Sequence, residues 1–467
     1  MASSAFLQSL RWSVALSSLC LLLAAGCATS SLPDVAALTR AAGQGTPEVV
    51  GTKGKLPPGR ARALLGREVE GARSADLIKK TTRLMESLSG HPLTSGNKIT
   101  LLVDGPATYK AMFEAMTSAR NSINFETFIF SDDEIGRKFA DLFVQKQAEG
   151  VQVNLIYDSV GSLHTAPDFF QRLRASDVNV LEFNPVNPLK LKKRLRVTQR
   201  DHRKVLVVDG RVGIAGGVNV SGVYSRPSSP ISSGSSSGEG WRDTDVLVEG
   251  PAVAELQHAF LETWQHQKGP PLADRDYFPR LEAKGRSLVE VIPSFPGEIH
   301  RLTYVMYVAA LQNALYSIDL TTPYFVPDRQ IMKAITDAVQ RGVEVRIIVP
   351  GSSDETLAFY AGRSRYEDLL ESGVKIYERR DRMVHAKTAV IDGVWSTVGS
   401  TNLDLWSFAR NNEINVMVIG TNFANELEGL FERDLAVSDG ITKESWSRRS
   451  AGSRVKETFS RLLSHWL

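Results

Sequence analysis

The stretch Asp201-His-Arg-Lys-Val-Leu-Val-Val-Asp-Gly210 occurs a second time, with changes, as Val384-His-Ala-Lys-Thr-Ala-Val-Ile-Asp-Gly393. Both copies have the pattern His-x-Lys, four residues, Asp-Gly. The aliphatic and β-branched run after each Lys predicts a strand that ends in an Asp-Gly turn. Because side chains alternate along a strand, we expect the His and Lys of each copy on one face of that strand.

The repeat extends beyond this motif. His385 follows His202 by 183 residues, and the same spacing relates three later positions. These pairs are Gly216 with Gly399, Gly217 with Ser400, and Asn219 with Asn402. A match of this length and order indicates an internal duplication, so two equivalent halves are expected to supply one motif each.

The two halves differ in length after the motif. The segment from Tyr224 to Gly240 is almost entirely Ser, Gly and Pro, which predicts a flexible loop. Beyond it the spacing between the copies becomes 170 residues, so that Asp243 matches Glu413. A carboxylate at this position can hold an imidazole in one tautomer. An exposed acid at the start of a strand is the alternative.

Two histidines and two lysines are the residue types that phosphodiester transfer needs. A neutral imidazole can attack phosphorus, an imidazolium can protonate the leaving oxygen, and two lysines can hold the phosphoryl oxygens. One motif would supply only half of this set. Asn219 and Asn402 can donate to the same oxygens, and Ser400 can assist in the second half, whereas Gly217 has no hydroxyl.

The paired motif with its downstream Asn resembles the His-Lys-Asp signature of the phospholipase D superfamily. Over residues 95–440 the sequence is most similar to bacterial cardiolipin synthases, in particular at 200–204, 216–219, 322–327 and 399–404. The catalytic residues implied by the resemblance are His202, Lys204, Asp209, His385, Lys387 and Asp392, with support from Asn219, Asp243, Ser400, Asn402 and Glu413. Asp209 and Asp392 lie at predicted strand ends, which favours a structural role for both.

Helices and strands alternate in both halves. In the first half we expect strands at 99–103, 123–129 and 151–157, with helices at 107–119 and 135–149. The second half repeats this order at 309–315, 317–320, 331–341 and 343–349. Gly150 and Gly342 are expected to end the matching helices. Together with the resemblance, this order implies an α/β fold of two phospholipase D-like α/β sandwich domains, related by a pseudo-twofold axis, with the active site at their interface.

Composition suggests five parts along the chain. Their expected bounds are 1–27 for a signal peptide, 28–95 for a tether and N-terminal helical segment, 96–285 for the first domain, 286–440 for the second domain, and 441–467 for a basic amphipathic tail. Residues 28–60 are expected to be the tether, because Ser, Gly, Pro and Ala dominate and apolar periodicity is weak. Residues 61–91 have the spacing of an amphipathic helical segment.

The first 27 residues are typical of a secretory signal. An apolar run from Trp12 to Ala25 follows Arg11 and is too short for a stable membrane span of about 20 residues. The sequence before Cys27 resembles a bacterial lipoprotein signal, which implies cleavage and acylation at Cys27. An ordinary cleaved signal or an uncleaved anchor is the alternative. Each of these alternatives exports the chain, and lipidation would place it at a membrane, on the periplasmic side.

Two basic segments could contact anionic lipid. The run from Leu189 to Arg196 is the densest, although a solvated loop explains it equally well. The tail from Trp446 to Leu467 alternates basic and apolar residues, which is typical of an interfacial helix or of a helix packed on the body. Tyr324 and Phe325 could line the substrate cleft or belong to the core.

Overall composition leaves a globular lipid enzyme as the interpretation. The chain has 467 residues, 42% of them hydrophobic, with a net charge of +3, which does not argue for a nucleic-acid partner. Its two cysteines, Cys20 and Cys27, exclude a cysteine metal site in the body, and no cofactor or metal is expected. The expected partners are phosphatidylglycerol, other alcohol acceptors and the membrane surface. A hydrolytic phospholipase D, a nuclease or an inactive lipid-binding protein are the alternatives to a cardiolipin synthase-like phosphatidyltransferase.

Overall fold

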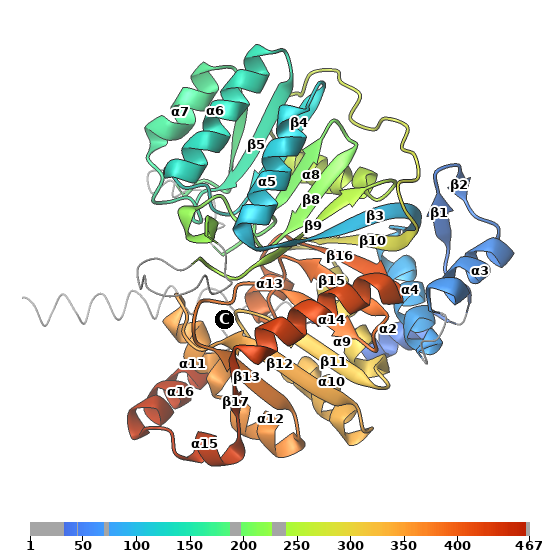
Figure 1. The fold of residues 1–467 in the computed structure, drawn as a ribbon, viewed down its shortest axis with the longest axis vertical. Coiled ribbons are helices and arrows are strands. Elements are labelled where there is room, and N and C mark those ends of the chain that lie inside the picture. Colours follow the sequence, from blue (N-terminus) through green and yellow to red (C-terminus); the bar gives the residue numbers. More distant parts are fainter. Residues whose placement is uncertain (1–31, 44, 70–73, 187–197, 227–239, 464–467) are drawn as a thin grey trace, which may run out of the picture. The chain divides into compact units, whose positions relative to one another are not determined.

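The computed structural model describes residues 32–43, 45–69, 74–186, 198–226 and 240–463 (Figure 1). The chain divides into two units, Met1–Pro33 and Asp34–Leu467. Both sequence halves lie in the second unit, so the duplicated parts form one compact body. Three expectations lie outside the described residues, namely the signal with Cys27, the basic run Leu189–Arg196, and most of the Ser-Gly-Pro loop.

The first half begins with an N-terminal segment and continues into alternating strands and helices. Its helices are α2 (Val35–Ala41), α3 (Pro58–Glu68), α4 (Ala75–Ser89), α5 (Asp104–Thr117), α6 (Glu134–Ala148), α7 (Pro167–Ala175), the short η2 (Gly222–Tyr224) and α8 (Val253–His266). Its strands are β1 (Val49–Gly51), β2 (Gly54–Lys55), β3 (Leu93–Val103), β4 (Ser122–Thr127), β5 (Gln152–Asp158), β6 (Asn179–Phe183), β7 (Val205–Val208), β8 (Val212–Gly216) and β9 (Thr244–Glu249).

The second half repeats this order. Its helices are α9 (Leu302–Asn313), α10 (Arg329–Gln340), α11 (Thr356–Arg363), α12 (Tyr366–Ser372), α13 (Leu405–Ala409), α14 (Thr421–Ala436), α15 (Lys443–Ser447) and α16 (Ala451–Leu463). Its strands are β10 (Ser287–Ser294), β11 (Ser317–Thr321), β12 (Glu344–Pro350), β13 (Lys375–Arg379), β14 (Thr388–Ile391), β15 (Trp395–Gly399), β16 (Glu413–Ile419) and β17 (Ser438–Ile441). The helices and strands expected within residues 99–157 and 309–349 are confirmed, with ends that differ by a few residues.

The sheet shows the duplication directly. In the first half the strand order is β6-β5-β4-β7-β8-β9-β3. The second half has the same order, β13-β12-β11-β14-β15-β16-β10. In each, the first three strands are parallel and the remaining pairs are antiparallel. β3 also pairs with β10, so the two halves share one continuous sheet, which confirms the α/β fold with pseudo-twofold symmetry.

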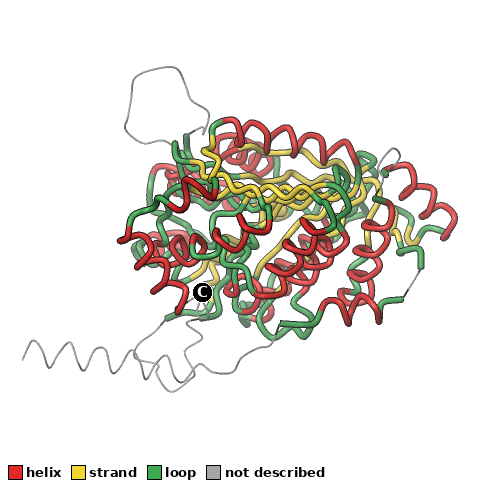
Figure 2. Tube along the Cα trace, turned by 90° about the horizontal axis from the view of Figure 1, so that it is seen from below, coloured by secondary structure: helices red, strands yellow, loops and turns green. Residues whose placement is uncertain are grey.

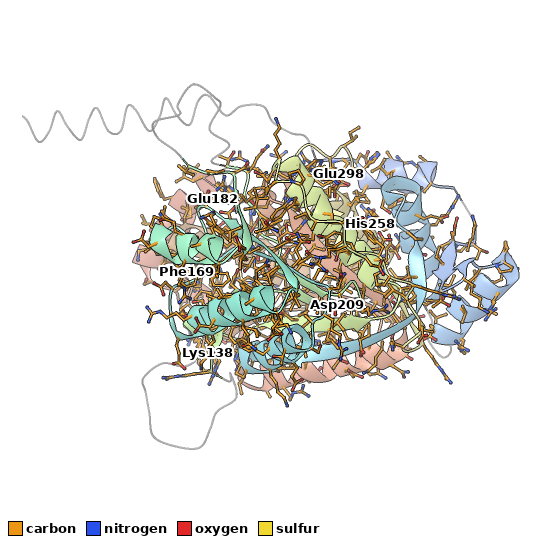
Figure 3. The ribbon with its side chains drawn as sticks, turned by 90° about the horizontal axis from the view of Figure 1, so that it is seen from above. Lys138, Phe169, Glu182, Asp209, His258 and Glu298 are labelled. Carbon is orange, nitrogen blue, oxygen red and sulfur yellow. The ribbon has the colours of Figure 1, made fainter. Side chains whose placement is uncertain are left out.

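Helices cover both faces of the strands (Figure 2). In the first half α5, α6 and α7 enclose a core rich in phenylalanine. Phe169 of α7, labelled in Figure 3, is one of its buried members. A second core lies between α8, α14 and the central strands of both halves, with Val205, Val246, Val390 and Val416 among its members. These strands are buried on both faces, which explains why their sequences are continuous apolar runs rather than alternating ones.

The two Asp-Gly turns have the backbone geometry that their sequence predicts. Asp209 and Gly210 have φ of 52° and 62°, and Asp392 and Gly393 have φ of 54° and 61°. Two successive residues with positive φ are the mark of the tight hairpin turn that asparagine or aspartate followed by glycine favours. The turns join β7 to β8 and β14 to β15.

Three expectations need correction. The His and Lys of each motif precede β7 and β14 rather than lying within them, because the backbone N–H of each histidine donates to a carbonyl of the other half of the molecule. Residues 34–60 are not a tether, because Val35 and Val49 are fully buried and β1 pairs with β3. The tail forms two helices, α15 and α16, instead of one. Among the described residues, no helix combines the length and apolar character needed to cross a bilayer.

Candidate active site

The first histidine is held by the second half of the molecule. Nδ1 of His202 lies 3.1 Å from both carboxylate oxygens of Glu413, at the start of β16. The backbone N–H of His202 donates to the carbonyl of Asn412 at 3.0 Å. The edge of the Phe128 ring lies against the imidazole, with 5.2 Å between ring centroids. These contacts fix the ring so that Nδ1 donates to Glu413 and Nε2 keeps its lone pair.

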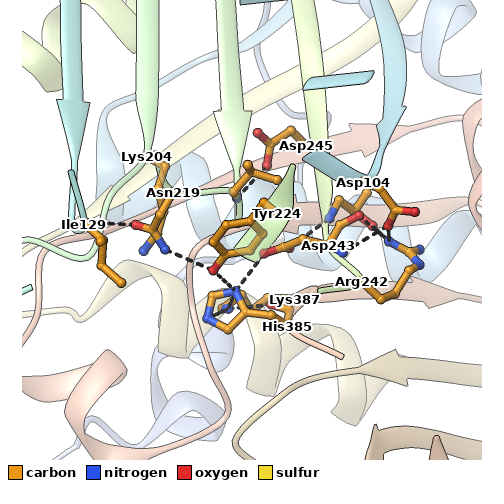
Figure 4. Close-up of polar contacts among 12 residues, drawn as sticks. Asp104, Ile129, Lys204, Asn219, Tyr224, Arg242, Asp243, Asp245, His385 and Lys387 are labelled. Carbon is orange, nitrogen blue, oxygen red and sulfur yellow. Dashed lines mark hydrogen bonds and ion pairs between the residues drawn. The ribbon is translucent and has the colours of Figure 1, made fainter. Parts of the chain in front are cut away.

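The second histidine is held by the first half in the same way (Figure 4). Nδ1 of His385 lies 2.7 Å from Oδ2 of Asp243, which precedes β9. The backbone N–H of His385 donates to the carbonyl of Arg242 at 2.7 Å. Each carboxylate that follows one motif therefore holds the histidine of the other motif. Neither half contains a complete site, and the contact between the halves assembles both His-carboxylate pairs.

The two motif lysines lie beside the histidines. Nζ of Lys204 donates to the carbonyl of His202, and Nζ of Lys387 donates to that of His385, both at 2.5 Å. Nζ of Lys387 is also 3.0 Å from each ring nitrogen of His385. All four side chains are buried, so their electrostatic interactions are screened far less than they would be in water.

Burial keeps both imidazoles neutral. It lowers the pKa of His202 to about 4, with help from the charge of Lys204 and against the attraction of Glu413. Burial and the charge of Lys387 lower the pKa of His385 to about 4. For Glu413 and Asp243, burial opposes ionisation, but their interactions with His202 and His385, including the Nδ1–H hydrogen bonds, and with the charges of Lys204 and Lys387 outweigh it and hold both carboxyl pKa values below their ordinary range. The resting pairs are neutral imidazoles that donate to carboxylates.

Burial lowers the pKa of both motif lysines. Burial and the charge of Lys387 lower the pKa of Lys204 to about 7. Burial lowers the pKa of Lys387 to about 8, although Asp243 and Glu413 oppose this shift. Two ammonium groups enclosed together repel each other. A bound anion would relieve this repulsion, so the arrangement is suited to a negatively charged ligand such as a phosphodiester.

The difference between Gly217 and Ser400 has a steric cause. The hydroxyl of Ser400 donates to Oε2 of Glu413 and steadies that carboxylate. At Gly217 a Cβ atom would lie 2.1 Å from Oδ1 of Asp243, well inside contact distance. The position of the Asp243 carboxylate therefore leaves room only for glycine at residue 217. The two halves thus reach the same His-carboxylate contact in different ways.

Substitution of Gly217 by alanine is expected to lower kcat by about 10- to 100-fold, because a shift of the Asp243 carboxylate by about 1 Å misplaces His385. Initial rates of phosphodiester transfer measure the effect, and thermal unfolding of the same variant reports on the fold. Gly222→Ala is the matched control, since its Cβ would meet only the carboxylate end of Asp133 at 3.2 Å. Equal rates for Gly217→Ala and wild type would contradict the steric explanation.

The prediction of a flexible loop from Tyr224 to Gly240 is wrong at its first residue. Tyr224 is fully buried, and its hydroxyl lies 3.2 Å from Nδ1 of His385. Trp241, at the far end of the loop, packs against the same imidazole with ring centroids 5.4 Å apart. Sequence reasoning missed both residues, and missed Phe128. The sequence did offer a signal for Tyr224 and Trp241, because large aromatic residues at both ends of a Ser-Gly-Pro segment indicate that these ends are buried.

The two asparagines differ in their contacts. Nδ2 of Asn219 donates to the hydroxyl of Tyr224 at 3.2 Å, and Oδ1 accepts from the backbone N–H of Ile129 at 3.0 Å. Oδ1 of Asn402 is buried without a hydrogen-bond partner among the described residues. Asn219 therefore helps to hold Tyr224, whose hydroxyl contacts His385. Tyr324 also faces His385, at 6.4 Å between ring centroids, whereas Phe325 is a core residue.

Asp209 and Asp392 lie away from the imidazoles and bind backbone instead. The carboxylate of Asp209 accepts from the N–H groups of Arg120, Asn121 and Ser122, at 2.7–2.9 Å for the shortest contact of each. Asp392 accepts from residues 315, 316 and 317 in the same manner, at 2.7–3.0 Å. In both halves the motif aspartate ties its hairpin turn to the start of the neighbouring strand, β4 or β11.

Comparison with known proteins identifies the family. Residues 112–225 and 307–435 match the family described as "Cardiolipin synthase, PLD-like domain". A cardiolipin synthase of Geobacillus thermodenitrificans is 34% identical over 376 residues, which are 80% of this chain and 73% of that protein. The chain belongs to the cardiolipin synthase family. The two matched segments of this family contain one histidine-lysine motif each.

Other members of the family extend the match. Cardiolipin synthase A of Pseudomonas fluorescens is 33% identical over 384 residues, covering 82% of this chain and 78% of that protein. The crystal structure of phosphatidylserine synthase from Haemophilus influenzae Rd KW20 superposes with a TM-score of 0.57 at 15% identity, over 83% of this chain and 97% of that chain, which shows a shared fold. The protein is thus a phospholipase D-superfamily phosphatidyltransferase of the cardiolipin synthase type.

Proposed function

We propose that the protein transfers a phosphatidyl group from one phosphatidylglycerol to another, releasing glycerol and forming cardiolipin, through a phosphohistidine. The observation that carries this proposal is the pair of imidazoles, each held by a carboxylate of the opposite half, with two lysines beside them. Such a site supplies one nucleophile, one acid-base group and positive charge for phosphoryl oxygens. His202 is assigned as the nucleophile and His385 as the acid-base group.

In the first step Nε2 of His202 attacks the phosphorus of phosphatidylglycerol. The P–O bond to glycerol breaks as the P–N bond forms, and His385 gives its proton to the departing glycerol oxygen. In the second step His385 takes the proton of a glycerol hydroxyl on another phosphatidylglycerol, whose oxygen attacks phosphorus and breaks the P–N bond. Lys204 and Lys387 hold the non-bridging oxygens, and both histidines return to their starting states.

The proton on His385 arrives with the substrate. Without substrate, burial and the charge of Lys387 keep this imidazole neutral, with a pKa of about 4. A phosphodiester brings one negative charge next to His385 and the lysines, which favours the protonated form of each. Binding of substrate is therefore coupled to proton uptake, and the neutral His202 meets a charged His385 only when the phosphodiester is present.

The pH dependence of kcat/KM follows from these groups. Below a pH of about 4 His202 is protonated and cannot attack, so kcat/KM is expected to rise as the pH increases through this value. Above about 4 His385 must take up its proton on binding, so kcat/KM is expected to fall gradually, and above about 7 it falls more steeply along an alkaline limb where Lys204 also loses its charge in the free enzyme. Lys204→Arg keeps a charge at this position and should move the alkaline limb toward about 8, where Lys387 titrates. An alkaline limb that stays in place in this variant would contradict the assignment to Lys204.

Mass spectrometry of the lipid products tests the function. Purified protein is incubated with phosphatidylglycerol alone, with added phosphatidylethanolamine, and with a short alcohol. Cardiolipin and free glycerol in the first reaction are the expected products. Phosphatidic acid as the main product would assign a hydrolytic phospholipase D, because water would then be the acceptor at the same four residues. Products that require phosphatidylethanolamine would instead change the acceptor.

We also propose that the protein is exported and anchored by lipid at Cys27, on the periplasmic side of a bacterial membrane. The support is the apolar run before Cys27 and the signal-like residues that precede it. Clickable palmitate fed to cells is expected to label the wild type but not Cys27→Ser, measured after immunoprecipitation. Equal label in both proteins, or none in the wild type, would exclude an anchor at this residue.

A further inference from the structure

Helix α16 has its apolar stripe turned away from the protein. Val455, Phe459 and Leu462 follow one another at spacings of four and three residues and are 69%, 60% and 72% exposed. The side chains turned inward are polar, with Glu457 at 3% and Ser460 at 4% exposure. A helix that merely packs on a globular body buries its apolar side. The orientation of α16 is the reverse, so its apolar side is left for another contact.

Ion pairs fix this orientation. Glu457 accepts from Nε of Arg449 at 2.8 Å and lies 3.6 Å from Nε of Arg363 on α11. Both guanidinium groups lie over the ring of buried Trp446, at 4.4 Å and 4.8 Å from its centroid. Buried and partly buried charges of this kind bind only in a narrow geometry. The ion pairs of Glu457 with Arg449 and Arg363 therefore hold the polar side of α16 against α11, so that its apolar side cannot turn inward.

Charge favours an anionic partner for the outward side. Arg454, Lys456 and Arg461 are all exposed and flank the apolar stripe, since they lie about 100–120° from it around the helix. The only acidic residue of α16 is Glu457, which faces inward. Apolar side chains in the middle with basic residues on both sides suit the boundary between headgroups and acyl chains of an anionic bilayer.

A series of packing contacts also connects α16 with the surroundings of His385. α16 packs on α11, and Gly362 of α11 approaches the backbone of Phe325 so closely that a Cβ would lie 2.7 Å from its carbonyl oxygen. The neighbouring Tyr324 faces His385. In the first half, exposed Leu163 lies on the same loop as Gly161. Gly161 packs closely against Phe128, and the ring of Phe128 lies beside His202. Exposed apolar side chains on α16 and at Leu163 are thus connected to the two histidines through the residues packed between them.

We propose that α16 is a membrane-docking element, which inserts Val455, Phe459 and Leu462 into the interface of an anionic bilayer and so holds the active site at the surface that contains its substrate. The proposal rests on the proposed function in one respect, the lipid nature of the substrate. The docking itself depends only on the exposed apolar side of α16, the ion pairs of Glu457 on its inward side, and the flanking basic residues.

A single fluorophore on α16 tests the contact. The probe is an environment-sensitive label on Phe459→Cys in the full chain, with Cys20 and Cys27 replaced by serine, mixed with phosphatidylglycerol vesicles. A blue-shifted, brighter emission is expected with these vesicles, and a much smaller change with phosphatidylcholine vesicles. Ile299→Cys is the matched control, because this apolar residue is 83% exposed and lies outside α16. An unchanged label at 459, or a shift that appears without vesicles as protein concentration rises, would overturn the proposal, the latter in favour of a second copy of the chain.

Turnover rates on two physical forms of phosphatidylglycerol distinguish a loss of membrane docking from a loss of catalysis. Replacement of Val455, Phe459 and Leu462 by serine is expected to lower the rate on phosphatidylglycerol vesicles at least about tenfold, and to leave the rate on dispersed short-chain phosphatidylglycerol unchanged. Equal loss on both substrates would overturn the docking role. If the label shifts but neither form of phosphatidylglycerol is converted by the wild type, the proposed function fails while the docking stands. If phosphatidylglycerol is converted without any shift of the label, the docking fails while the proposed function stands.

Discussion

Replacement of either His202 or His385 by alanine is expected to lower kcat by at least about 10⁴-fold, because each imidazole has a separate role in both steps of the transfer. The two side chains are nearly buried, and each contacts a carboxylate of the other half. Loss of one cannot be compensated by the other, since Nε2 of one ring attacks phosphorus while the other ring moves the proton. Single-turnover assays with labelled phosphatidylglycerol measure the effect.

The control for these variants is His164→Ala, which removes an exposed histidine outside the site. Circular dichroism and thermal unfolding show whether each variant keeps its fold. Near-normal turnover in either active-site variant would contradict the paired mechanism. Trapping of the intermediate under mildly alkaline denaturing conditions, in which the P–N bond survives, adds a second result, because a phosphatidylated peptide that contains His385 instead of His202 would exchange the two roles and leave the mechanism intact.

Neutralising the opposed carboxylates is the change with the second largest expected effect. Asp243→Asn and Glu413→Gln should each lower kcat by about 10²- to 10⁴-fold, because an amide no longer fixes the Nδ1–H tautomer or stabilises the charged ring. The contacts cross between the halves, so Glu413→Gln acts on His202 and Asp243→Asn acts on His385. Glu413→Gln is therefore expected to slow formation of the phosphohistidine itself.

Nuclear magnetic resonance of labelled histidines tests the crossed pairing independently of rate. In Glu413→Gln the ring signals of His202 should change and those of His385 should stay nearly constant, and Asp243→Asn should give the reverse. Asp141→Asn, an exposed acid on α6, serves as the control for general effects of charge. A larger change at His385 in Glu413→Gln would contradict the crossed arrangement.

Much of the fold follows from local sequence. The strands and helices of both halves were predictable because apolar runs, helix-ending glycines and Asp-Gly turns act over a few residues. Gly150 and Gly342 both have positive φ after their helices, as the sequence indicates. The N-terminal segment was wrongly predicted because its fully buried positions Val35 and Val49 are far apart along the chain, and such scattered contacts leave no periodic pattern.

The sequence by itself determined the duplicated motif, the residue types of the site and the equivalence of Asp243 with Glu413, because these depend on spacing along one chain. Only the tertiary structure decided which carboxylate holds which histidine, since this depends on how the backbones at Asn412 and Arg242 pair with the motif of the other half. The same holds for Tyr224, which reaches His385 across 161 residues of chain. It also holds for α16, whose apolar side faces outward because the contact of Glu457 with Arg363 and Arg449 stabilises the opposite side against the body.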